Sequence, residues 1–360
     1  MGKLTGITVV DLSLFLPGPM MTMMMADHGA QVIKVEPQAG DPARGMEPME
    51  AGQSVWFRNL NRGKTSRALD LKSEGGKAAL WDLLSRADVM VEGFRPGVMK
   101  RLGFDYEAVS RRHPKIVYCS ISAFGQSGEM AHHPAHDMAV QALTGFLLVN
   151  DGPDGTPVVP GVPSADMAAG LNGLSAVLMA LIGREKTGRG DYIDIAMLDS
   201  MLPWCAHIAG DAISGGEAPV SHLQRSLGGA AFYNVYRTAD AKYVVLGGRE
   251  PKFARALLTA LDRLDLMPLA ESDAGTVQQP LIDYLCGTFA TRSRDEWVKW
   301  FADKGVAFSP VLDFREALDQ DFLRKRGLLI ESDGAHQIGP SFRFASEEKW
   351  IPKPAPELGK

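Results

Sequence analysis

The sequence feature that most constrains the fold is a strand-helix-strand pattern near the start of the chain. Ile7 to Leu12 is short and β-branched, and Pro17-Gly18-Pro19 ends it. The methionine-rich run 20–26 then predicts a helix, and Gln31 to Glu36 predicts a second strand. This β-α-β unit is typical of parallel sheets that are covered by helices. Its first loop has neither GxGxxG nor a Walker lysine, so neither a dinucleotide site nor a P-loop phosphate site is predicted.

The same alternation continues to residue 196. It predicts an α/β fold with a Rossmann-like, doubly wound sheet, which binds ligands beyond the carboxyl ends of its strands. Further strands are predicted at 67–71, 88–92, 116–122 and 192–196, with helices at 73–87, 138–148, 167–182 and 197–213. Basic residues gather at the strand ends, either as a site for a polyanion such as a nucleotide diphosphate or as a solvated rim. They are Arg58, Arg62, Lys64, Lys72, Arg95 and Arg101.

A second, smaller domain of α+β type is predicted downstream. Residues 214–229 are Gly-rich and have linker character, and 232–237 with 243–246 reads as an antiparallel pair. Residues 338–360 are Pro-rich and are expected to pack along another element. The predicted large domain comprises 1–198 and 330–360, the small domain 222–320, and the linkers 199–221 and 321–329.

The composition is that of an ordinary globular protein. The chain has 360 residues, 45% of them hydrophobic, and a net charge of −5, which argues against nucleic acid or an anionic membrane as an obligatory partner. Cys119, Cys205 and Cys286 are widely spaced and predict neither disulfides nor a zinc site. The N-terminus lacks a signal-peptide core, and the apolar run 167–182 is judged too short to span a bilayer. We therefore expect a cytoplasmic protein.

Two acidic residues stand where predicted helices begin. His136-Asp137 directly precedes the apolar run 138–148, and Asp166 opens the run 167–182. Helix amides point outward at this end and the dipole is positive, so the position stabilises an anion, either the carboxylate or a charge developing on a substrate. An Asp at this place is also an ordinary cap, and a nearby His an ordinary surface residue. Position alone leaves both interpretations open.

Several stretches are together specific for one family, although each alone is a weak signal. They are GITVVDLSLFLPGP, ADHGAQVIKVE, DLKSEGGK, ADVMVEGFRPGVMKRLG, IVYCSISAFGQSG, HPAHD, SADMAAG and EKTGRGDYIDIAMLDS. Over essentially its whole length the chain resembles the superfamily of family III CoA-transferases and α-methylacyl-CoA racemases, the CaiB/BaiF group. The resemblance implies a Rossmann-like large domain, a small domain and a homodimer of two interlocked chains.

The resemblance also implies an acyl-CoA thioester as the ligand, and no cofactor beyond the CoA moiety of that substrate. The family commonly has a basic residue after the KVE-type strand where this chain has Pro37-Gln38, and we expect Arg44 or Lys34 to replace it. The expected CoA contacts are Leu71, Lys72, Phe94, Arg95, Arg101, Phe124 and Ala135, of which Lys72, Phe94 and Arg101 would hold the adenosine diphosphate part.

The two branches of the superfamily share the position of Asp166. In transferases it resembles a nucleophile that carries acyl and CoA groups, and in racemases it is one of two acid/base groups. Racemase-like enzymes have His-Asp, as at His136, where transferases usually have Tyr-Asp or Tyr-Glu, and they have a Glu-Pro pair, as at Glu250. Residues 140–145 are closer to the transferase pattern. We interpret the chain as a racemase-like isomerase of acyl-CoA and fatty acid metabolism, with CoA transfer as the alternative.

Racemisation of a 2-methylacyl-CoA requires two bases on opposite faces of one weakly acidic carbon. We hypothesise that His136 serves one enantiomer and Asp166 the other. Asp137 or Glu250 would orient the imidazole, and an amide at the start of the Asp166 helix would stabilise the enolate. No metal, flavin or nicotinamide is expected. The alternatives are CoA transfer with Asp166 as the nucleophile, and a CoA-thioester binding protein without turnover.

Overall fold

The chain forms two compact units, each with its own sheet. The computed structural model describes residues 1–152, 154–332, 334–347 and 350–360. The first unit contains residues 1–144, 160–204 and 320–360, and the second contains residues 145–159 and 205–319. The chain therefore leaves the first unit after residue 144 and returns to it at residue 160.

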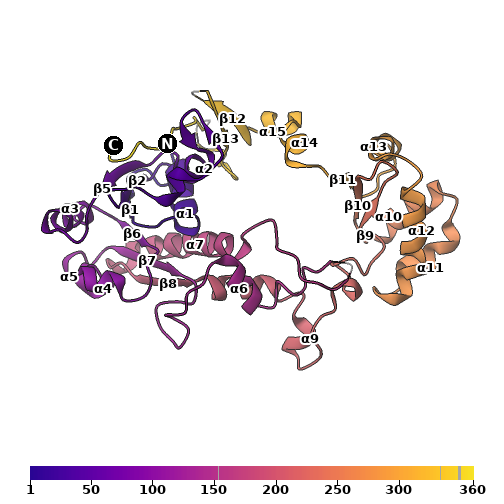
Figure 1. The fold of residues 1–360 in the computed structure, drawn as a ribbon, viewed down its shortest axis with the longest axis horizontal. Helices are drawn as coiled ribbons and strands as arrows, with labels where there is room; N and C mark the ends of the chain where they lie inside the picture. The colour runs from indigo at the N-terminus through magenta and orange to yellow at the C-terminus, as the bar shows by residue number, and fades with distance from the viewer. Residues whose placement is uncertain (153, 333, 348–349) are drawn as a thin grey trace. The chain divides into compact units, whose positions relative to one another are not determined.

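A six-stranded parallel sheet forms the centre of the first unit (Figure 1). Its strands are β1 (Thr8–Asp11), β2 (Gln31–Glu36), β5 (Thr65–Ala68), β6 (Val89–Glu92), β7 (Val117–Ser122) and β8 (Tyr192–Ala196). Their order is β5-β2-β1-β6-β7-β8, with Val9 opposite Val32 on one side and Val89 on the other. The strand order reverses between β1 and β6, where a doubly wound sheet opens a crevice for ligands. The predicted α/β class is confirmed.

Helices cover both faces of this sheet because its central strands are apolar on both sides. On one face α1 (Pro17–Asp27) and α7 (Ser164–Thr187) lie side by side (Figure 1), and Gly173 of α7 meets Met21 of α1. The methionine-rich helix α1 is therefore part of the core. On the other face a second core joins the sheet to α3 (Glu74–Leu84), α4 (Val98–Leu102) and α5 (Tyr106–Arg112).

Two predicted helices are shorter than the apolar runs that suggested them. Helix α6 (Asp137–Leu143) does not continue to residue 148, because Gly145 has a left-handed φ of 78°. The helix predicted at 197–213 is divided into α8 (Met197–Met201) and α9 (Gly210–Ile213), with a 3-10 turn at Pro203 between them. Proline lacks the amide hydrogen that a continuous helix needs.

Helix α7 is longer than predicted. It has 24 residues and ends at Gly188, which has a φ of 69°. The expectation that this segment is too short to span a bilayer is therefore wrong. By length and composition, α7 is long enough and apolar enough to cross a membrane, and it is the one helix among the described residues that is. The core helix of a globular protein can have the same length and apolar composition. Because α7 buries small residues such as Ala168 and Ala169, its composition does not imply that it spans a membrane.

The C-terminal residues return to the first unit and lie along its edge strand, β5. The backbone N–H of Gly63 donates to Pro354 O at 2.9 Å, and the N–H of Gly359 donates to Ser66 Oγ at 3.0 Å. As predicted for a Pro-rich tail, the segment packs along another element. Smaller elements of this unit are α2 (Val55–Asn61), α15 (Asp321–Lys325) and the hairpins β3–β4 (Met49–Glu50, Gln53–Ser54) and β12–β13 (Leu329–Ser332, Ala335–Ile338).

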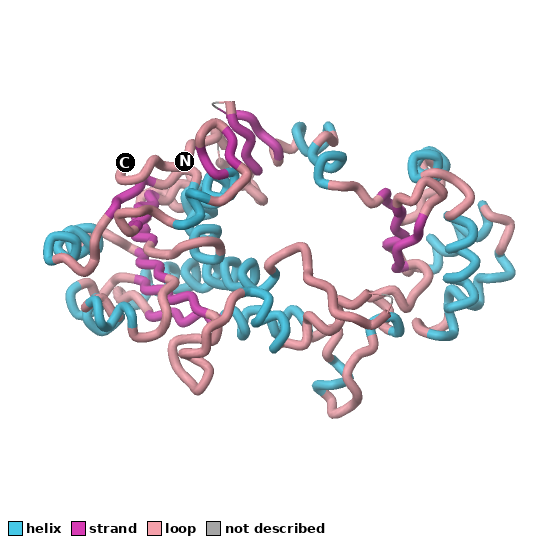
Figure 2. Tube along the Cα trace, viewed as in Figure 1, coloured by secondary structure: helices cyan, strands magenta, loops and turns pink. Residues whose placement is uncertain are grey.

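The second unit is an antiparallel sheet packed against helices (Figure 2). Its strands are β9 (Tyr233–Arg237), β10 (Tyr243–Gly247) and β11 (Phe308–Pro310), in the order β11-β10-β9. The predicted antiparallel pair is confirmed, with Tyr243 opposite Arg237. Phe289 and Trp297 are central to an aromatic core beneath the sheet. The helices are α10 (Pro251–Ala260), α11 (Met267–Glu271), α12 (Gln279–Phe289), α13 (Arg294–Phe301) and α14 (Phe314–Leu318).

Candidate functional site

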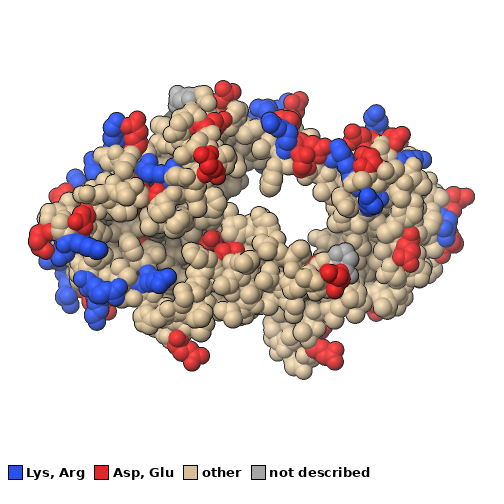
Figure 3. All heavy atoms as spheres, viewed as in Figure 1, with Lys and Arg blue, Asp and Glu red and all other residues tan. Residues whose placement is uncertain are grey.

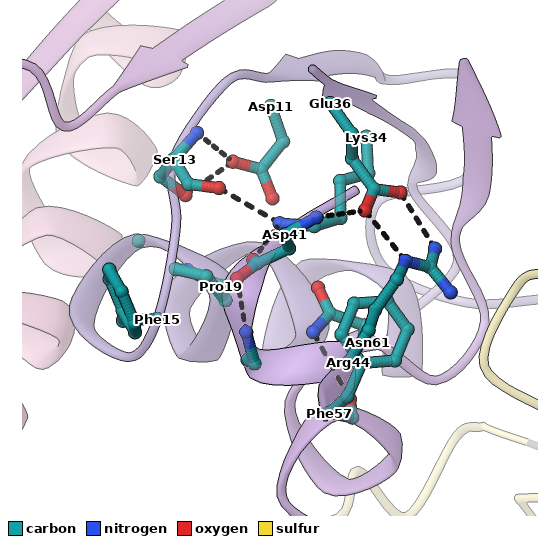
Figure 4. A network of polar contacts seen from close by, with 12 residues as sticks. Asp11, Ser13, Phe15, Pro19, Lys34, Glu36, Asp41, Arg44, Phe57 and Asn61 are labelled. Carbon is teal, nitrogen blue, oxygen red and sulfur yellow. Dashed lines mark hydrogen bonds and ion pairs between the residues drawn. The ribbon is translucent and has the colours of Figure 1, made fainter. Parts of the chain in front are cut away.

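A buried polar network holds the turn that follows β1 (Figure 4). Asp11 accepts hydrogen bonds from the Ser13 N–H at 2.9 Å, Thr22 Oγ1 at 2.6 Å and Lys64 Nζ at 3.0 Å. Lys34 Nζ donates to Ser13 O at 2.8 Å. Burial opposes ionisation of Asp11, but the lysine charges and the hydrogen bonds lower its pKa to about 2. The charges are paired, as burial requires, and together they fix the turn.

This turn lies beside the first part of α7. A Cβ atom on Gly170 would come within 2.8 Å of Pro17 O, so only glycine permits this approach. Phe15, at the tip of the turn, has a left-handed φ of 62°, and its carbonyl accepts from Trp56 Nε1 at 3.3 Å. The Phe15 ring points away from the network (Figure 4) and is 39% exposed. The buried network thus fixes the turn that leads to Pro17, and Pro17 contacts Gly170, which lies one helical turn after Asp166 on α7.

A cavity of about 410 Å³ opens at the carboxyl ends of β1, β2, β5 and β6, where the strand order reverses. Leu71, Lys72 and Phe94, all expected to contact CoA, line it. An apolar cavity with an aromatic ring and one exposed cation suits a heteroaromatic base that carries phosphates. Apart from Leu71 and Phe94, the expected contacts did not include the apolar wall residues, although these lie at or near the same strand ends. These walls include Leu12, Leu14, Val35, Leu69, Val98 and Leu102.

Glu92 fixes the loop that carries Phe94. Its Oε2 accepts from the Phe94 N–H at 2.8 Å, and burial, aided by the charge of Asp194, raises its pKa to about 7. The predicted contacts Arg95 and Arg101 follow on this loop and on α4, and both are exposed. Figure 3 shows basic side chains gathered over α4 and α5. The basic residues in the last turns of these two helices are Lys100, Arg101, Arg111 and Arg112.

Neither residue expected to replace the missing basic CoA contact faces this cavity. Lys34 is fully buried and pairs with Asp41 at 2.9 Å. Arg44 donates twice to Glu36, at 2.7 Å from both Nε and Nη2, and its guanidinium lies over the Phe57 ring. Both side chains are held within the fold. Pro37 and Gln38 themselves line the cavity, so the basic contact expected after β2 has no replacement from these two residues.

The two acidic residues at the predicted helix starts are brought together. Asp137 Oδ1 accepts from the backbone N–H groups of Ala165 at 2.8 Å and Asp166 at 3.1 Å. Its Oδ2 accepts from Gln141 Nε2 at 2.5 Å. Asp137 therefore caps α7 from α6, which differs from the expected role of orienting the His136 imidazole. The same contacts occupy two amides at the start of α7, so these are not the enolate donors that we expected.

Asp166 has an unusual environment for a carboxyl group. Burial and the nearby charge of Asp137 raise its pKa to about 7. His136 stands at the N-cap position of α6, where its exposed side chain makes no capping hydrogen bond. The site thus places a carboxyl group with a raised pKa on α7 and an exposed imidazole at the start of α6, and these two helices pack together.

The remaining predicted site residues belong neither to the strand-end cavity nor to the contacts around Asp137 and Asp166. Phe124 follows β7, and its ring is 5.8 Å from that of His133, while Ala135 is half-buried just before α6. Glu250 belongs to the second unit, where it precedes Pro251 at the start of α10. Gln141 was not singled out as a site residue. Its position one helical turn after Asp137 is the only sequence signal that could have indicated it.

Comparison with known proteins identifies the family of this chain. The model of the family described as CoA-transferase family III matches residues 4–360. The chain belongs to CoA-transferase family III. This family III chain is 34% identical to acetyl-CoA:oxalate CoA-transferase of Acetobacter aceti, over 99% of this chain and 93% of that protein. It is 33% identical to human alpha-methylacyl-CoA racemase, over 99% of this chain and 86% of that protein.

A solved structure extends the likeness of this family III chain to the fold. The crystal structure of a CAIB/BAIF family protein from Brucella suis matches with a TM-score of 0.86 and 28% identity, covering 99% of this chain and 97% of that one. The chain is therefore a member of an enzyme superfamily that contains both CoA-transferases and racemases.

Proposed function

We propose that this protein catalyses a 1,1-proton transfer at the α-carbon of 2-methylacyl-CoA thioesters, as a racemase or epimerase. The observation that carries the proposal is the environment of Asp166, whose pKa is raised to about 7 by burial and by Asp137. Imidazole is the side chain that most often serves as the partner in general acid–base catalysis. His136 offers that imidazole from the start of the packed helix α6.

The reaction balances with these two groups alone. The unprotonated member of the pair removes the α-proton, and the C–H electron pair passes into the enolate of the thioester. The protonated member then gives its proton to the opposite face of the same carbon. After one turnover the two groups have exchanged protonation states, which readies the enzyme for the other enantiomer. A raised Asp166 pKa keeps both states populated near pH 7.

The CoA moiety would bind at the carboxyl ends of the strands. The cavity beside β1 and β6 offers apolar walls and the Phe94 ring to the adenine, while Lys72 and Arg101 would contact phosphates. The contacts of Asp137 are directed to α7 and Gln141, so the proposed mechanism gives Asp137 no part in orienting the His136 imidazole. The cytoplasmic location remains a prediction from composition.

A second function, CoA transfer between acyl groups, is favoured by two observations. Transferases are among the similar proteins, and residues 140–145 are closer to the transferase pattern than to the racemase pattern. In that reaction the Asp166 carboxylate attacks the thioester carbonyl and expels CoA thiolate, which leaves an acyl-aspartyl anhydride. The thiolate then attacks the aspartyl carbonyl and releases the first acid. A second acid repeats the two steps in reverse order.

Proton NMR of a pure 2-methylacyl-CoA enantiomer in deuterated water, without free acid, tests the proposal. We expect the α-proton signal to disappear and both enantiomers to form. The variants His136→Ala and Asp166→Ala should abolish racemisation. His132→Ala and Asp199→Asn are matched controls, because these residues are exposed near the same elements, and both should keep wild-type rates.

Other outcomes of this experiment identify the alternatives. No α-proton exchange, followed by CoA transfer once a carboxylic acid is added, would replace the racemase proposal with the transferase. Tight CoA binding with neither reaction would indicate a binding protein without turnover.

We also propose that the protein is a homodimer. Exposed apolar side chains follow one face of α7: Met179 is 70% exposed, Ile182 is 65% exposed, and Leu171 lies on the same stripe. Leu171, Met179 and Ile182 fall within about a quarter of the helix circumference at 100° per residue. Such a stripe commonly marks a protein interface, and the family resemblance supplies a second chain as the partner.

A further inference from the structure

We propose that Gln141 is a positioning residue that holds Asp166 in place through Asp137. The inference rests on the proposed function, because it assumes that Asp166 reacts with the substrate. It goes further in assigning a role to a side chain that donates to Asp137 and Val162 rather than to Asp166. The argument follows a short chain of contacts from α6 to the first turn of α7.

The first contact is within α6. Gln141 follows Asp137 by one helical turn, a spacing at which Gln and Asp side chains meet. Its Nε2 donates to Asp137 Oδ2 at 2.5 Å and also lies 3.4 Å from the carbonyl oxygen of Val162, just before α7. Both neighbours are acceptors, so only the NH₂ end of the amide fits there. Gln141 therefore contacts both the Asp137 carboxylate and the segment that precedes α7.

The second contact crosses from α6 to α7. The first backbone N–H groups of a helix have no partner inside the helix. The N-cap residue of α7 is Pro163, whose side chain has no atom that could accept a hydrogen bond from them. Asp137 accepts from two of these amides, those of Ala165 and Asp166. The orientation of the reactive residue's own backbone thus depends on where the Asp137 carboxylate is held. Gln141 holds the other oxygen of that carboxylate.

Packing alone does not explain a glutamine at this position. Gln141 is 1% exposed, and its Oε1 has no hydrogen-bond partner among the described residues. Burying an amide costs free energy that an apolar side chain of the same length would not cost. The amide is consistent with a requirement for a neutral donor beside Asp137. A carboxylate at this place would repel Asp137, and a methionine would leave it without its donor.

The charges around Asp166 predict a measurable consequence. Several titratable groups lie on the elements packed against α7, and among them Asp137 is the charge that shifts the pKa of Asp166. They are His136 and Asp137 of α6, Asp199 of α8, Asp27 of α1, Tyr118 and Cys119 of β7, and Tyr192 and Asp194 of β8. Burial and Asp137 raise the pKa of Asp166. If Asp137 loses its donor, its carboxylate moves toward water and away from Asp166, and the loss of this nearby negative charge lowers the pKa of Asp166. An added carboxylate raises it.

The test measures the titration of Asp166 without relying on activity. The stability difference between the protein and its Asp166→Asn variant is determined from pH 4 to 9 by denaturant unfolding, and its inflection reports the Asp166 pKa. The same comparison is made in the Gln141→Met and Gln141→Glu backgrounds. We expect Gln141→Met to lower the inflection by about one pH unit and Gln141→Glu to raise it. Thr144→Val, at the end of α6, is the control and should not move it.

Activity provides the second readout. If the proposed function is correct, Gln141→Met should lower kcat by roughly tenfold or more, because Asp166 is displaced, while KM for the acyl-CoA changes little. Opposite shifts of the inflection with no activity in the wild-type protein would sustain the positioning role and overturn the proposed function. An unmoved inflection in both Gln141 variants, with only a lower Tm, would reduce Gln141 to a packing residue and overturn the inference.

Discussion

At the scale of single residues, the Asp11–Lys64 pair is expected to have a large effect on stability. Both side chains are fully buried, 3.0 Å apart. Asp11→Asn leaves the Lys64 charge unpaired, and breaking a buried pair in this way costs about 3–5 kcal/mol. Equilibrium unfolding in urea measures the cost. In the double variant Asp11→Asn/Lys64→Met we expect much of it to be recovered, and a double variant as unstable as the single one would contradict this account.

The pH dependence of the Asp11→Asn cost has a definite sign. Burial lowers the pKa of Lys64 to about 8, although Asp11 opposes the shift. Without Asp11 the lysine releases its proton at a lower pH in the folded state, while its unfolded pKa stays near its ordinary value. The folded variant then binds fewer protons than the unfolded chain, so its stability rises with pH over that interval. The cost should therefore be larger at pH 5.5 than at pH 8.

The site could be predicted from the sequence only where the signal is local. His136, Asp137 and Asp166 stand at helix starts that apolar runs indicate. The capping of α7 by Asp137 joins residues far apart in the sequence, and no spacing rule indicates it. Lys34 and Arg44 were chosen because they are near Pro37 in sequence. Burial excludes both as CoA contacts, because a charge inside the fold must be paired there, and each of the two pairs with an acidic residue.

At the scale of elements, the contact between α1 and α7 decides how Asp166 is presented. Gly170→Ala should lower stability by about 1–3 kcal/mol, because its Cβ meets the Pro17 carbonyl and one element must shift. Since Gly170 is one turn from Asp166, kcat should fall as well. Gly183→Ala is the matched control on the same helix: its Cβ has free space, and it should stabilise by up to about 1 kcal/mol. Thermal unfolding and steady-state kinetics compare the two, and equal stabilities would contradict the close approach.

The strands were easier to predict than the helix limits. β-branched apolar runs bounded by Gly and Pro placed β1, β2, β6, β7 and β8 close to their observed limits. The helix limits depend on single turn residues and on packing. Gly145 ends α6 early, and α7 continues past the apolar run through Arg184 and Lys186, which favour the C-terminal turn of a helix.

At the scale of the whole molecule, the exposed stripe of α7 makes the proposed homodimer testable. Met179→Glu places a charge in the middle of the stripe and should shift the protein from dimer to monomer in sedimentation velocity. Ala78→Glu is the control, because Ala78 is exposed on α3, on the opposite face of the sheet. A wild-type protein that sediments as a monomer at micromolar concentration would refute the dimer.

The C-terminal residues that lie along β5 have a consequence for protein synthesis. β8 completes the other edge of the sheet at residue 196, but β5 is covered only when residues 354–360 have left the ribosome. At about 5–20 residues per second, a nascent chain exposes this edge for on the order of 10 s. An uncovered strand edge can pair with a neighbouring nascent chain. Overproduction, which crowds unfinished chains on polysomes, therefore favours aggregation through this edge more than through any surface of the finished fold.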